Sequence, residues 1–275
     1  MSALWLALHF PLLALEAEHG PRPEPRVLVR GNRVLLANPA ARAAGVEAGL
    51  RLGTARALCE TLEVHEARAD QQHQALLREA RQLLALTPQV CPAPPATVLL
   101  EVGGCLKLFG GFKPLLARVD RYRLHCPLTS RLGIGPTPLA AWHLTDPPAL
   151  DEQPEAARFQ AWLADLPLAE LDLDERLRQR LQAPGFRTLG DVFPLPRAAL
   201  GKRFGVDFLD WLQRLLGEQA DPRKPISPPR PFRERLDFDD PLDDLDRLTG
   251  PMGELLARLE DTLNRHQESL VTLRW

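Results

Sequence analysis

The sequence predicts an α+β protein, and two changes along the chain carry that prediction. Up to Pro147-Pro148, strand-like and helix-like segments alternate, which is typical of an α/β layer. Beyond these prolines the spacing of apolar residues is typical of helices only. Residues 221–231 then contain five prolines in eleven residues, which predicts an extended linker, and a last mixed segment follows. With 275 residues, 45% of them hydrophobic, the chain can form one large or two modest domains around a buried core.

The first part begins with an apolar strand at residues 4–10, which is too short to span a bilayer and is interrupted by polar residues and proline. A hairpin turning at Gly31-Asn32 follows. Short helices are predicted at 38–44 and 54–58. Apolar side chains three or four residues apart then predict an amphipathic helix over 69–86.

The remaining elements of the first part continue the alternation. β-like pieces at 98–102 and 106–109 flank Gly103-Gly104, and a helix is expected at 115–124. A strand at 131–135 leads to a helix at 137–144, where proline at the first helical position costs no hydrogen bond.

The second and third parts differ from the first in being mostly helical. Five helices are predicted in the second part, at 154–163, 168–181, 188–193, 197–204 and 206–216. After the linker, we expect a strand at 232–238, a helix at 251–267 and a β-like piece at 270–275.

Charge and cysteine usage exclude several classes of protein. A net charge of -2 excludes a uniformly basic DNA-coating protein, and four scattered cysteines suggest neither a zinc site nor a disulfide framework, which fits a reducing cytoplasm. Charge is uneven, however: residues 171–235 hold 13 Lys/Arg against 9 Asp/Glu, and residues 236–275 hold 4 against 10. Any nucleic-acid site is therefore expected in the second part and the linker.

The sharpest local motif is a helix-hairpin-helix pattern over residues 181–204, with Ala183-Pro184-Gly185-Phe186 as its turn. A glycine turn before a helix N-terminus can offer backbone amides to a phosphate without reading bases. Arg187, Lys202 and Arg203 are close enough in sequence to assist. The alternative is an ordinary helical hairpin with a glycine C-cap.

Four segments together resemble the Y-family, or translesion, DNA polymerases, and among them the ImuB-type homologues. They are residues 4–11 (LWLALHFP), 99–111 (LLEVGGCLKLFGG), 133–142 (GIGPTPLAAW) and the run 185–205. The resemblance implies a polymerase-like architecture with an α/β palm (1–25 and 70–165), small fingers (26–69), a helical thumb (166–220), the linker (221–231) and a partial little finger (232–275). The family's remaining little-finger strands would lie beyond Trp275, which is expected of a fragment or a shortened member.

The resemblance also implies that the catalytic metal site is lost. Active members hold two Mg²⁺ ions with three carboxylates, because hard anionic oxygens are needed beside the triphosphate. Those three positions align with Leu8, Val102 and Gly103, and alternation along the strand is expected to turn Glu101 away from them. We therefore expect no metal, no cofactor and no nucleotidyl transfer.

The nucleotide-binding positions are depleted in the same comparison. Of the family's Tyr-x-x-Arg pair only Arg42 is kept, a lysine of the palm becomes Trp142, and the steric-gate aromatic aligns with Leu13. His9, Trp5, Trp162 and Trp211 are interpreted as packing residues.

The resulting hypothesis is a non-catalytic DNA-binding scaffold of bacterial translesion synthesis, located in the cytoplasm at the nucleoid and not in a membrane. The resemblance implies a sliding clamp, an ImuA-type RecA-like protein and an error-prone C-family polymerase as partners. Sequence-nonspecific contacts to primer-template DNA are expected from ten residues: Pro184, Gly185, Phe186, Arg187, Lys202, Arg203, Arg223, Lys224, Arg230 and Arg233.

Two alternatives stay open. One is an active DNA-directed DNA polymerase whose metal ligands are displaced acids such as Glu101 and Glu16. The other is a chain in which only the helix-hairpin-helix region acts, attached to a core that merely folds.

Overall fold

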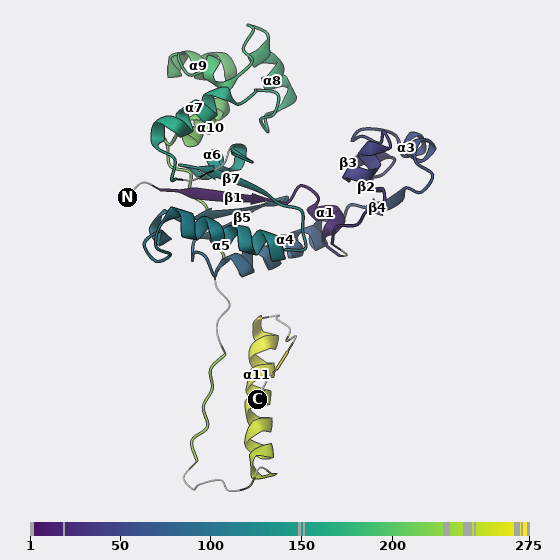
Figure 1. Ribbon diagram of the computed structural model, residues 1–275, viewed down its shortest axis with the longest axis vertical. Coiled ribbons are helices and arrows are strands. Elements are labelled where there is room, and N and C mark those ends of the chain that lie inside the picture. The colour runs from purple at the N-terminus through teal and green to yellow at the C-terminus, as the bar shows by residue number, and fades with distance from the viewer. Residues whose placement is uncertain are drawn as a thin grey trace. The chain divides into compact units, whose positions relative to one another are not determined.

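The computed structural model (Figure 1) describes residues 3–18, 20–147, 150, 152–227, 232–238, 244, 246–266, 270 and 272–273. The chain folds into two compact units, Met1–Ile226 and Ser227–Trp275. No helix in the described ranges is long and apolar enough to cross a membrane.

A four-stranded antiparallel sheet is the centre of the first unit, with the strand order β5-β6-β1-β7. The strands are β1 (Trp5–His9), β5 (Val90–Ala93), β6 (Thr97–Glu101) and β7 (Arg131–Gly135). The predicted strands at 4–10, 98–102 and 131–135 are confirmed. β5 was not predicted because it contains Pro92, which is tolerated only because β5 lies at the edge of the sheet.

The free edge of β5 is covered by the first half of the predicted linker. The amide of Ile226 donates to the carbonyl of Val90 at 2.8 Å, and the Asp221 carboxylate, with only 8% of its side chain exposed, pairs with Arg223 at 2.7 Å. Residues 221–226 therefore belong to the first unit, and the unit boundary falls inside the proline-rich run.

Two helices, α4 (Ala69–Leu83) and α5 (Phe112–His125), cover one face of the sheet. The helical periodicity predicted for α4 is confirmed, since Leu76 and Leu83 are fully buried. Leu6 and Leu8 of β1 belong to the same core. Because side chains alternate along a strand, Ala7 lies on the opposite face.

The opposite face is covered by the short helix α6 (Pro138–His143). Thr137 caps its N-terminus by accepting from the Ala140 amide, and Pro138 occupies the first helical position as predicted. The helix approaches β7 so closely that a Cβ at Gly133 or Gly135 would collide with the backbone of Ala141. Glycine at both positions is what permits this packing.

A smaller lobe is formed by β2 (Arg26–Arg30), β3 (Arg33–Ala37) and β4 (Glu63–Glu66) with α2 (Pro39–Ala43) and α3 (Leu52–Leu58). It follows the short helix α1 (Leu13–Glu16) and has its own small core around Val27, Val29 and Val34. The predicted hairpin and both helices are confirmed. β4, which pairs in parallel with β2, was missed because Val64 is its only apolar residue.

The helical part of the first unit contains α7 (Ala156–Asp165), α8 (Glu175–Gln182), α9 (Arg197–Phe204) and α10 (Val206–Leu216). Two predictions need correction. The helix expected over 168–181 begins only at Glu175, because the Asp174 carboxylate caps it there. The helix expected over 188–193 is a single 3-10 turn, η2 (Leu189–Asp191).

The helical part is joined to the sheet through α6. The Thr137 hydroxyl donates to the carbonyl of Leu215 at 3.0 Å, and the His143 ring meets the edge of Trp211 at 5.6 Å between ring centroids. Burial is the main cause that lowers the pKa of His143 to about 4, so the imidazole is neutral in this contact at pH 7.

The β-like piece expected over 106–109 is also corrected. After β6 the chain forms a 3-10 helix, η1 (Gly103–Cys105), and then a turn. The Glu101 carboxylate accepts from the amides of Gly103 and Gly104 at 3.0 and 3.4 Å, which ends the strand by bonding the next amides locally.

The second unit holds the 3-10 helix η3 (Asp246–Leu248) and the long helix α11 (Thr249–His266). The predicted helix is confirmed, but the predicted strand at 232–238 is wrong, because those residues pair with no strand in the described part of this unit. The Glu234 carboxylate instead pairs with Arg258 of α11 at 2.8 Å. Of the piece predicted at 270–275, residues 271, 274 and 275 lie outside the described residues and the others form no strand.

The variant Gly133→Ala should destabilise the first unit by about 1–3 kcal/mol, the usual cost of overpacking a core. The added methyl group would meet the Ala141 backbone and force α6 away from β7. Urea unfolding followed by circular dichroism measures the change. The control is Gly53→Ala in α3, where a Cβ has open space and helix propensity favours alanine. Equal unfolding midpoints for the two variants would contradict the packing argument.

Candidate nucleic-acid interface

The sheet face beneath α6 is lined by small apolar side chains between two tryptophans. Strand pairing places Trp5 opposite Glu101, Ala7 opposite Leu99 and His9 opposite Thr97. Ala7 and Leu99 form a buried cluster with Cys91, Ala93 and Ala141, against which Trp5 and Trp142 pack half-buried. The interpretation of Trp5 as a packing residue is confirmed.

The three positions expected to be vestiges of a metal site do not share this face. Leu8 and Val102 are fully buried in the core on the α4 and α5 side. Gly103 follows the strand, and its amide is bonded to the carboxylate of Glu101. The expected alternation is confirmed: Leu8 and Val102 lie on the α4 and α5 side, whereas Glu101, paired with Trp5, presents its side chain on the α6 side.

His9 is held on this face by a hydrogen bond of 2.9 Å between its Nδ1 atom and the Thr97 hydroxyl. Burial, followed by the charge of Arg131, lowers the pKa of His9 below its ordinary value. The imidazole is therefore mainly neutral near pH 7.

The two acids considered as displaced metal ligands both have structural partners. Glu101 caps η1 as described above. Glu16 is 4% exposed, and its carboxylate accepts from the Thr129 amide and hydroxyl, both at 2.7 Å. Within the described ranges, no group of three or more His, Cys, Asp or Glu side chains is arranged to hold a metal ion.

The expected nucleotide-binding residues lie on different elements. Arg42 is exposed on α2 of the smaller lobe, and Trp142 is half-buried on α6 against the apolar cluster of the sheet. Leu13 is buried in the main core at the start of α1.

The predicted phosphate-binding turn has the expected glycine conformation, but the amides that follow it are already hydrogen-bonded. Gly185 has a φ of 97°, as a glycine turn requires. However, the amides of Arg187 and Thr188 both donate to the Asp191 carboxylate, at 2.8 and 2.9 Å, so the turn already binds an anion of its own chain. These two amides, which follow the predicted turn, are therefore not available to a phosphate.

The side chains of the turn and of α9 are accessible. Pro184, Gly185 and Arg187 are exposed, and Phe186 is half-buried against the core. Lys202 and Arg203 are exposed at the end of α9, where the Arg203 guanidinium lies 5.3 Å from the centre of the Phe204 ring.

The remaining four predicted contacts have different surroundings. Arg223 is engaged by Asp221 at 2.7 Å and only 24% of its side chain is exposed, whereas Lys224 is exposed. Arg233 is exposed in the second unit, and Arg230 lies outside the described residues. Of the predicted contacts in the first unit, the exposed cations are therefore on the turn, at the end of α9 and at Lys224.

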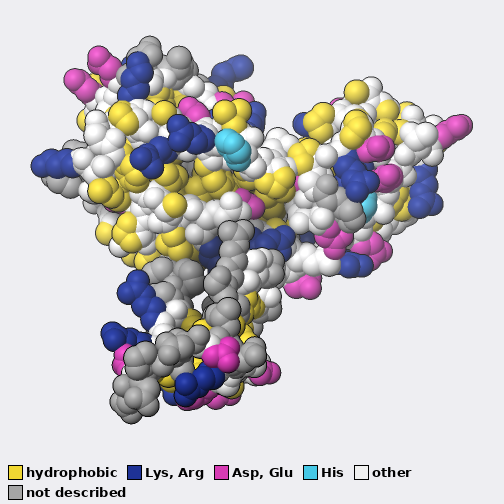
Figure 2. All heavy atoms as spheres, turned by 60° about the horizontal axis from the view of Figure 1, so that its bottom comes forward, with side chains coloured by type: hydrophobic (Ala, Val, Ile, Leu, Met, Phe, Trp, Pro, Cys, Tyr) yellow, Lys and Arg dark blue, Asp and Glu magenta, His cyan; other side chains and the backbone are white. Residues whose placement is uncertain are grey.

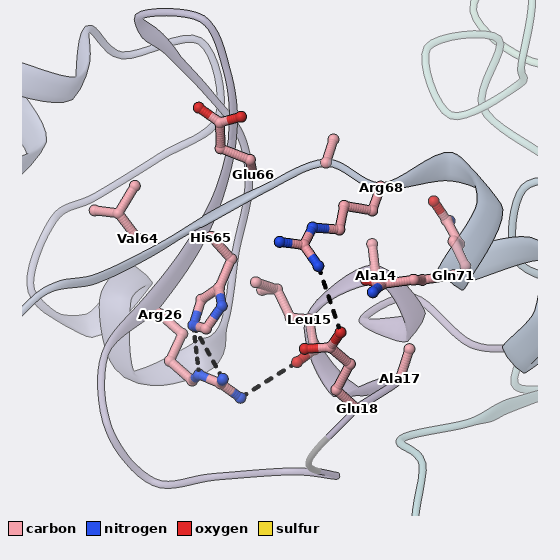
Figure 3. A pocket seen from close by; sticks show the side chains of 12 residues that line it. Ala14, Leu15, Ala17, Glu18, Arg26, Val64, His65, Glu66, Arg68 and Gln71 are labelled. Carbon is pink, nitrogen blue, oxygen red and sulfur yellow. Dashed lines mark hydrogen bonds and ion pairs between the residues drawn. The ribbon is translucent and has the colours of Figure 1, made fainter.

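A cavity of about 370 Å³ lies where the smaller lobe meets α1 and α4 (Figure 3). Its floor is Arg26, which is 4% exposed and donates to the His65 ring at 3.0 and 3.2 Å and to the Leu15 carbonyl at 3.2 Å. Glu63 neutralises this guanidinium at 3.0 Å. In Figure 3, Arg68 points across the same cavity toward Glu18.

This network matches no motif in the amino-acid sequence. The available signal was an arginine directly before the apolar run Val27-Leu28-Val29 of β2. Because Arg26 bonds both β4 and the backbone of α1, it fixes how the smaller lobe joins the sheet.

Residues 12–146 match the impB/mucB/samB family. The chain is 32% identical over 168 residues to Protein ImuB of Caulobacter vibrioides, a match that covers 59% of this chain and 36% of that protein. It is 29% identical over 167 residues to DNA polymerase IV of Moorella thermoacetica, covering 59% of this chain and 42% of that protein. The chain thus spans less than half the length of these relatives.

Solved structures of Y-family DNA polymerases share the fold. An insertion ternary complex of Dbh DNA polymerase matches with a TM-score of 0.65 at 20% identity, over 80% of this chain and 69% of that chain. DinB from Sulfolobus solfataricus matches with a TM-score of 0.63 at 21% identity, over 82% of this chain and 70% of that chain. The α+β fold is therefore that of a Y-family polymerase, as the resemblance implied.

The variant Asp191→Ala should lower the urea midpoint at neutral pH, because it removes the acceptor for two turn amides. These hydrogen bonds lower the pKa of Asp191 below its ordinary value. A carboxylate with a lowered pKa in the folded state stabilises the fold above the unfolded pKa, and this contribution is lost as pH falls through the folded pKa. The difference between wild type and variant should therefore be constant down to about pH 4 and shrink below it.

Asp191→Asn is the matched control, since it keeps an acceptor oxygen but cannot titrate. Its difference from wild type should be smaller at neutral pH than that of the alanine variant. Identical midpoints for wild type and Asp191→Ala at neutral pH would show that this carboxylate does not stabilise the turn.

Proposed function

Because residues 12–146 form a domain of the impB/mucB/samB family, we propose that this chain is a non-catalytic DNA-binding scaffold of bacterial translesion synthesis. It holds the backbone of primer-template DNA without sequence preference and bridges polymerase partners. Its relatives include Protein ImuB of Caulobacter vibrioides.

The observation that carries this proposal is that, in the described part of the chain, neither the aligned positions nor the sheet face beneath α6 brings several carboxylates together. Two Mg²⁺ ions need several anionic oxygens that converge on one point. Leu8 and Val102 are instead buried in the apolar core. The face beneath α6 presents Ala7, Leu99 and His9, with Glu101 as a carboxylate already bonded to backbone amides. Such a surface supports packing and binding better than metal-assisted phosphoryl transfer.

The hydrogen bonds that the two nearby carboxylates already accept support the same conclusion. The Glu101 carboxylate satisfies two backbone amides, and the Glu16 carboxylate satisfies an amide and a hydroxyl of Thr129. Recruiting either acid to a metal would leave these donors without partners, at a typical cost of about 1–3 kcal/mol for each buried group.

DNA binding is supported by the exposed cations of the helical part. Arg187, Lys202 and Lys224 are accessible without breaking a described ion pair, whereas Arg223 must first leave Asp221. Contacts of this kind to phosphates fix position and release counterions, so they do not read sequence. The side chains, and not the amides of residues 187 and 188, are the phosphate ligands in this proposal.

The proposal assigns parts of the chain as the family resemblance implies. Residues 1–25 and 70–165 act as a palm, 26–69 as fingers, 166–220 as a thumb and 232–275 as part of a little finger. A sliding clamp, an ImuA-type RecA-like protein and an error-prone C-family polymerase are the proposed partners, in the cytoplasm at the nucleoid.

A second candidate is an active DNA-directed DNA polymerase, and two observations favour it. DNA polymerase IV of Moorella thermoacetica is 29% identical to this chain over 167 residues. In addition, Glu101 supplies a carboxylate at the end of the central strand β6, opposite Trp5 of β1.

Primer extension separates the two candidates. We expect no extension by the purified chain with all four nucleotides and Mg²⁺ or Mn²⁺, under conditions in which the Moorella polymerase extends the same primer. Templated extension that disappears in Glu101→Ala would overturn the scaffold proposal and place a metal ligand at position 101.

A salt titration tests the DNA contacts. The triple variant R187Q/K202Q/R203Q should bind primer-template DNA more weakly at low salt. Its plot of log affinity against log salt concentration should be less steep by about 0.9 for each phosphate that the variant no longer neutralises. Fluorescence anisotropy measures both quantities.

Arg121→Gln is the control for this titration, because it removes one exposed charge from α5 on the other side of the sheet. Equal slopes for the wild type and the triple variant would exclude these three side chains as the DNA contacts.

A further inference from the structure

A groove of about 330 Å³ lies between the C-terminal ends of α4 and α5, on the sheet side opposite α6. Its lining includes Leu83 and Leu86 from the α4 side and Arg118, Arg121 and His125 from α5. Apolar and cationic groups therefore share one concave surface that the nucleic-acid proposal does not use.

The α5 side of the groove has an excess of positive charge. Lys113, Arg118 and Arg121 are exposed on this helix. Its only acidic residue, Asp120, is paired with Arg123 at 3.4 Å. Cations in the last turn of a helix offset its dipole, but Arg118 and Arg121 lie before that turn, so the dipole does not account for them.

One apolar side chain of the groove lining is nearly buried, and another lies on α5 outside the lining. Leu86 lines the groove and is 8% exposed, and Leu124, which precedes His125 of the lining along α5, is 84% exposed. Figure 2 shows the side of the molecule on which α4 and α5 lie, with dark blue side chains and a histidine beside a hydrophobic surface of the large lobe. An exposed leucine beside a cationic groove is an anchor point for another apolar group.

The groove is held in shape by a buried network below it. Glu79 of α4 is 6% exposed, and its carboxylate accepts from the Tyr122 hydroxyl and, at 3.5 Å, from the Cys126 thiol. Burial and this carboxylate raise the pKa of Tyr122, so the phenol keeps its proton and the bond that joins the two helices. The walls of the groove are therefore pre-organised for a ligand.

We propose that this groove is a docking site for an acidic segment of a protein partner that carries a large apolar anchor residue. Carboxylates of the segment pair with Arg118 and Arg121, and the anchor covers Ala85 and the exposed edge of Leu86. A nucleic acid would use the cations but leave the apolar floor uncovered, which is why a protein segment fits better. The site lies across the sheet from α6, so it is independent of the proposed DNA contacts.

The probe is a fluorescent peptide in which a Leu-Trp pair is flanked on both sides by glutamates, titrated with the full chain. Two companion peptides test the two parts of the match separately. One has glutamines in place of the glutamates, and the other has serines in place of Leu-Trp. We expect both companions to bind at least about tenfold more weakly, since each removes one half of the match. Equal binding of either companion would overturn the proposal.

The double variant R118E/R121E should weaken the acidic peptide by about tenfold or more, because like charges then face each other. Lys113→Glu is the matched control on the same helix, outside the groove lining, and should change affinity by less than about twofold. Equal effects of the two changes would show nonspecific attraction and overturn the proposal.

Two further titrations distinguish this site from the DNA-binding proposal. Primer-template affinity should be the same in wild type and R118E/R121E, while peptide affinity falls. A single-stranded oligonucleotide that loses affinity in R118E/R121E as strongly as the peptide does would identify the groove as a nucleic-acid surface instead. The triple variant R187Q/K202Q/R203Q should bind the peptide as tightly as the wild type does. That result would show that the groove and the DNA contacts are different sites.

Discussion

The close approach of α6 to β7 is the constraint on which the first unit depends. Gly133 and Gly135 leave no side chain between strand and helix, so the backbone of Ala141 rests directly on the sheet. α6 is then positioned to carry the helical part, through the bond from Thr137 to the Leu215 carbonyl and the contact of His143 with Trp211. Displacing α6 would therefore disturb the helical part as well as the sheet face.

The same packing decides what the sheet face can do chemically. α6 brings Ala141 and Trp142 onto Ala7 and Leu99, and this leaves a compact apolar surface between strands. The nearby carboxylate of Glu101 is used to bond the amides that follow β6. A fold shared with Y-family polymerases is here combined with a face built for packing, which is the physical basis of the scaffold proposal.

The two proposed surfaces lie on opposite sides of one sheet. The exposed cations of the turn and α9 belong to the helical part that docks through α6, whereas the groove between α4 and α5 lies behind the other face. A scaffold benefits from this arrangement, because nucleic acid and a protein partner do not compete for the same side chains.

Most of the elements follow from the amino-acid sequence alone, because their signals are local. Helical spacing predicts α4, Gly31-Asn32 predicts the hairpin, and Thr137-Pro138 predicts the start of α6. The family resemblance likewise needed only short motifs. β4 and β5 were missed because strand pairing with distant segments, not their own composition, makes them strands.

Which side chains reach the candidate site, in contrast, depends on how the elements pack. Alternation along a strand predicts that side chains 8 and 9 point to opposite faces of the sheet, as do side chains 101 and 102. It does not predict which of the two faces α4 and α5 cover. The glycine turn at 183–186 was also expected to expose backbone amides to phosphate, but folding places the Asp191 carboxylate against the two amides that follow it. Burial and hydrogen-bond partners depend on contacts made in three dimensions, and a sequence pattern records periodicity but not those contacts.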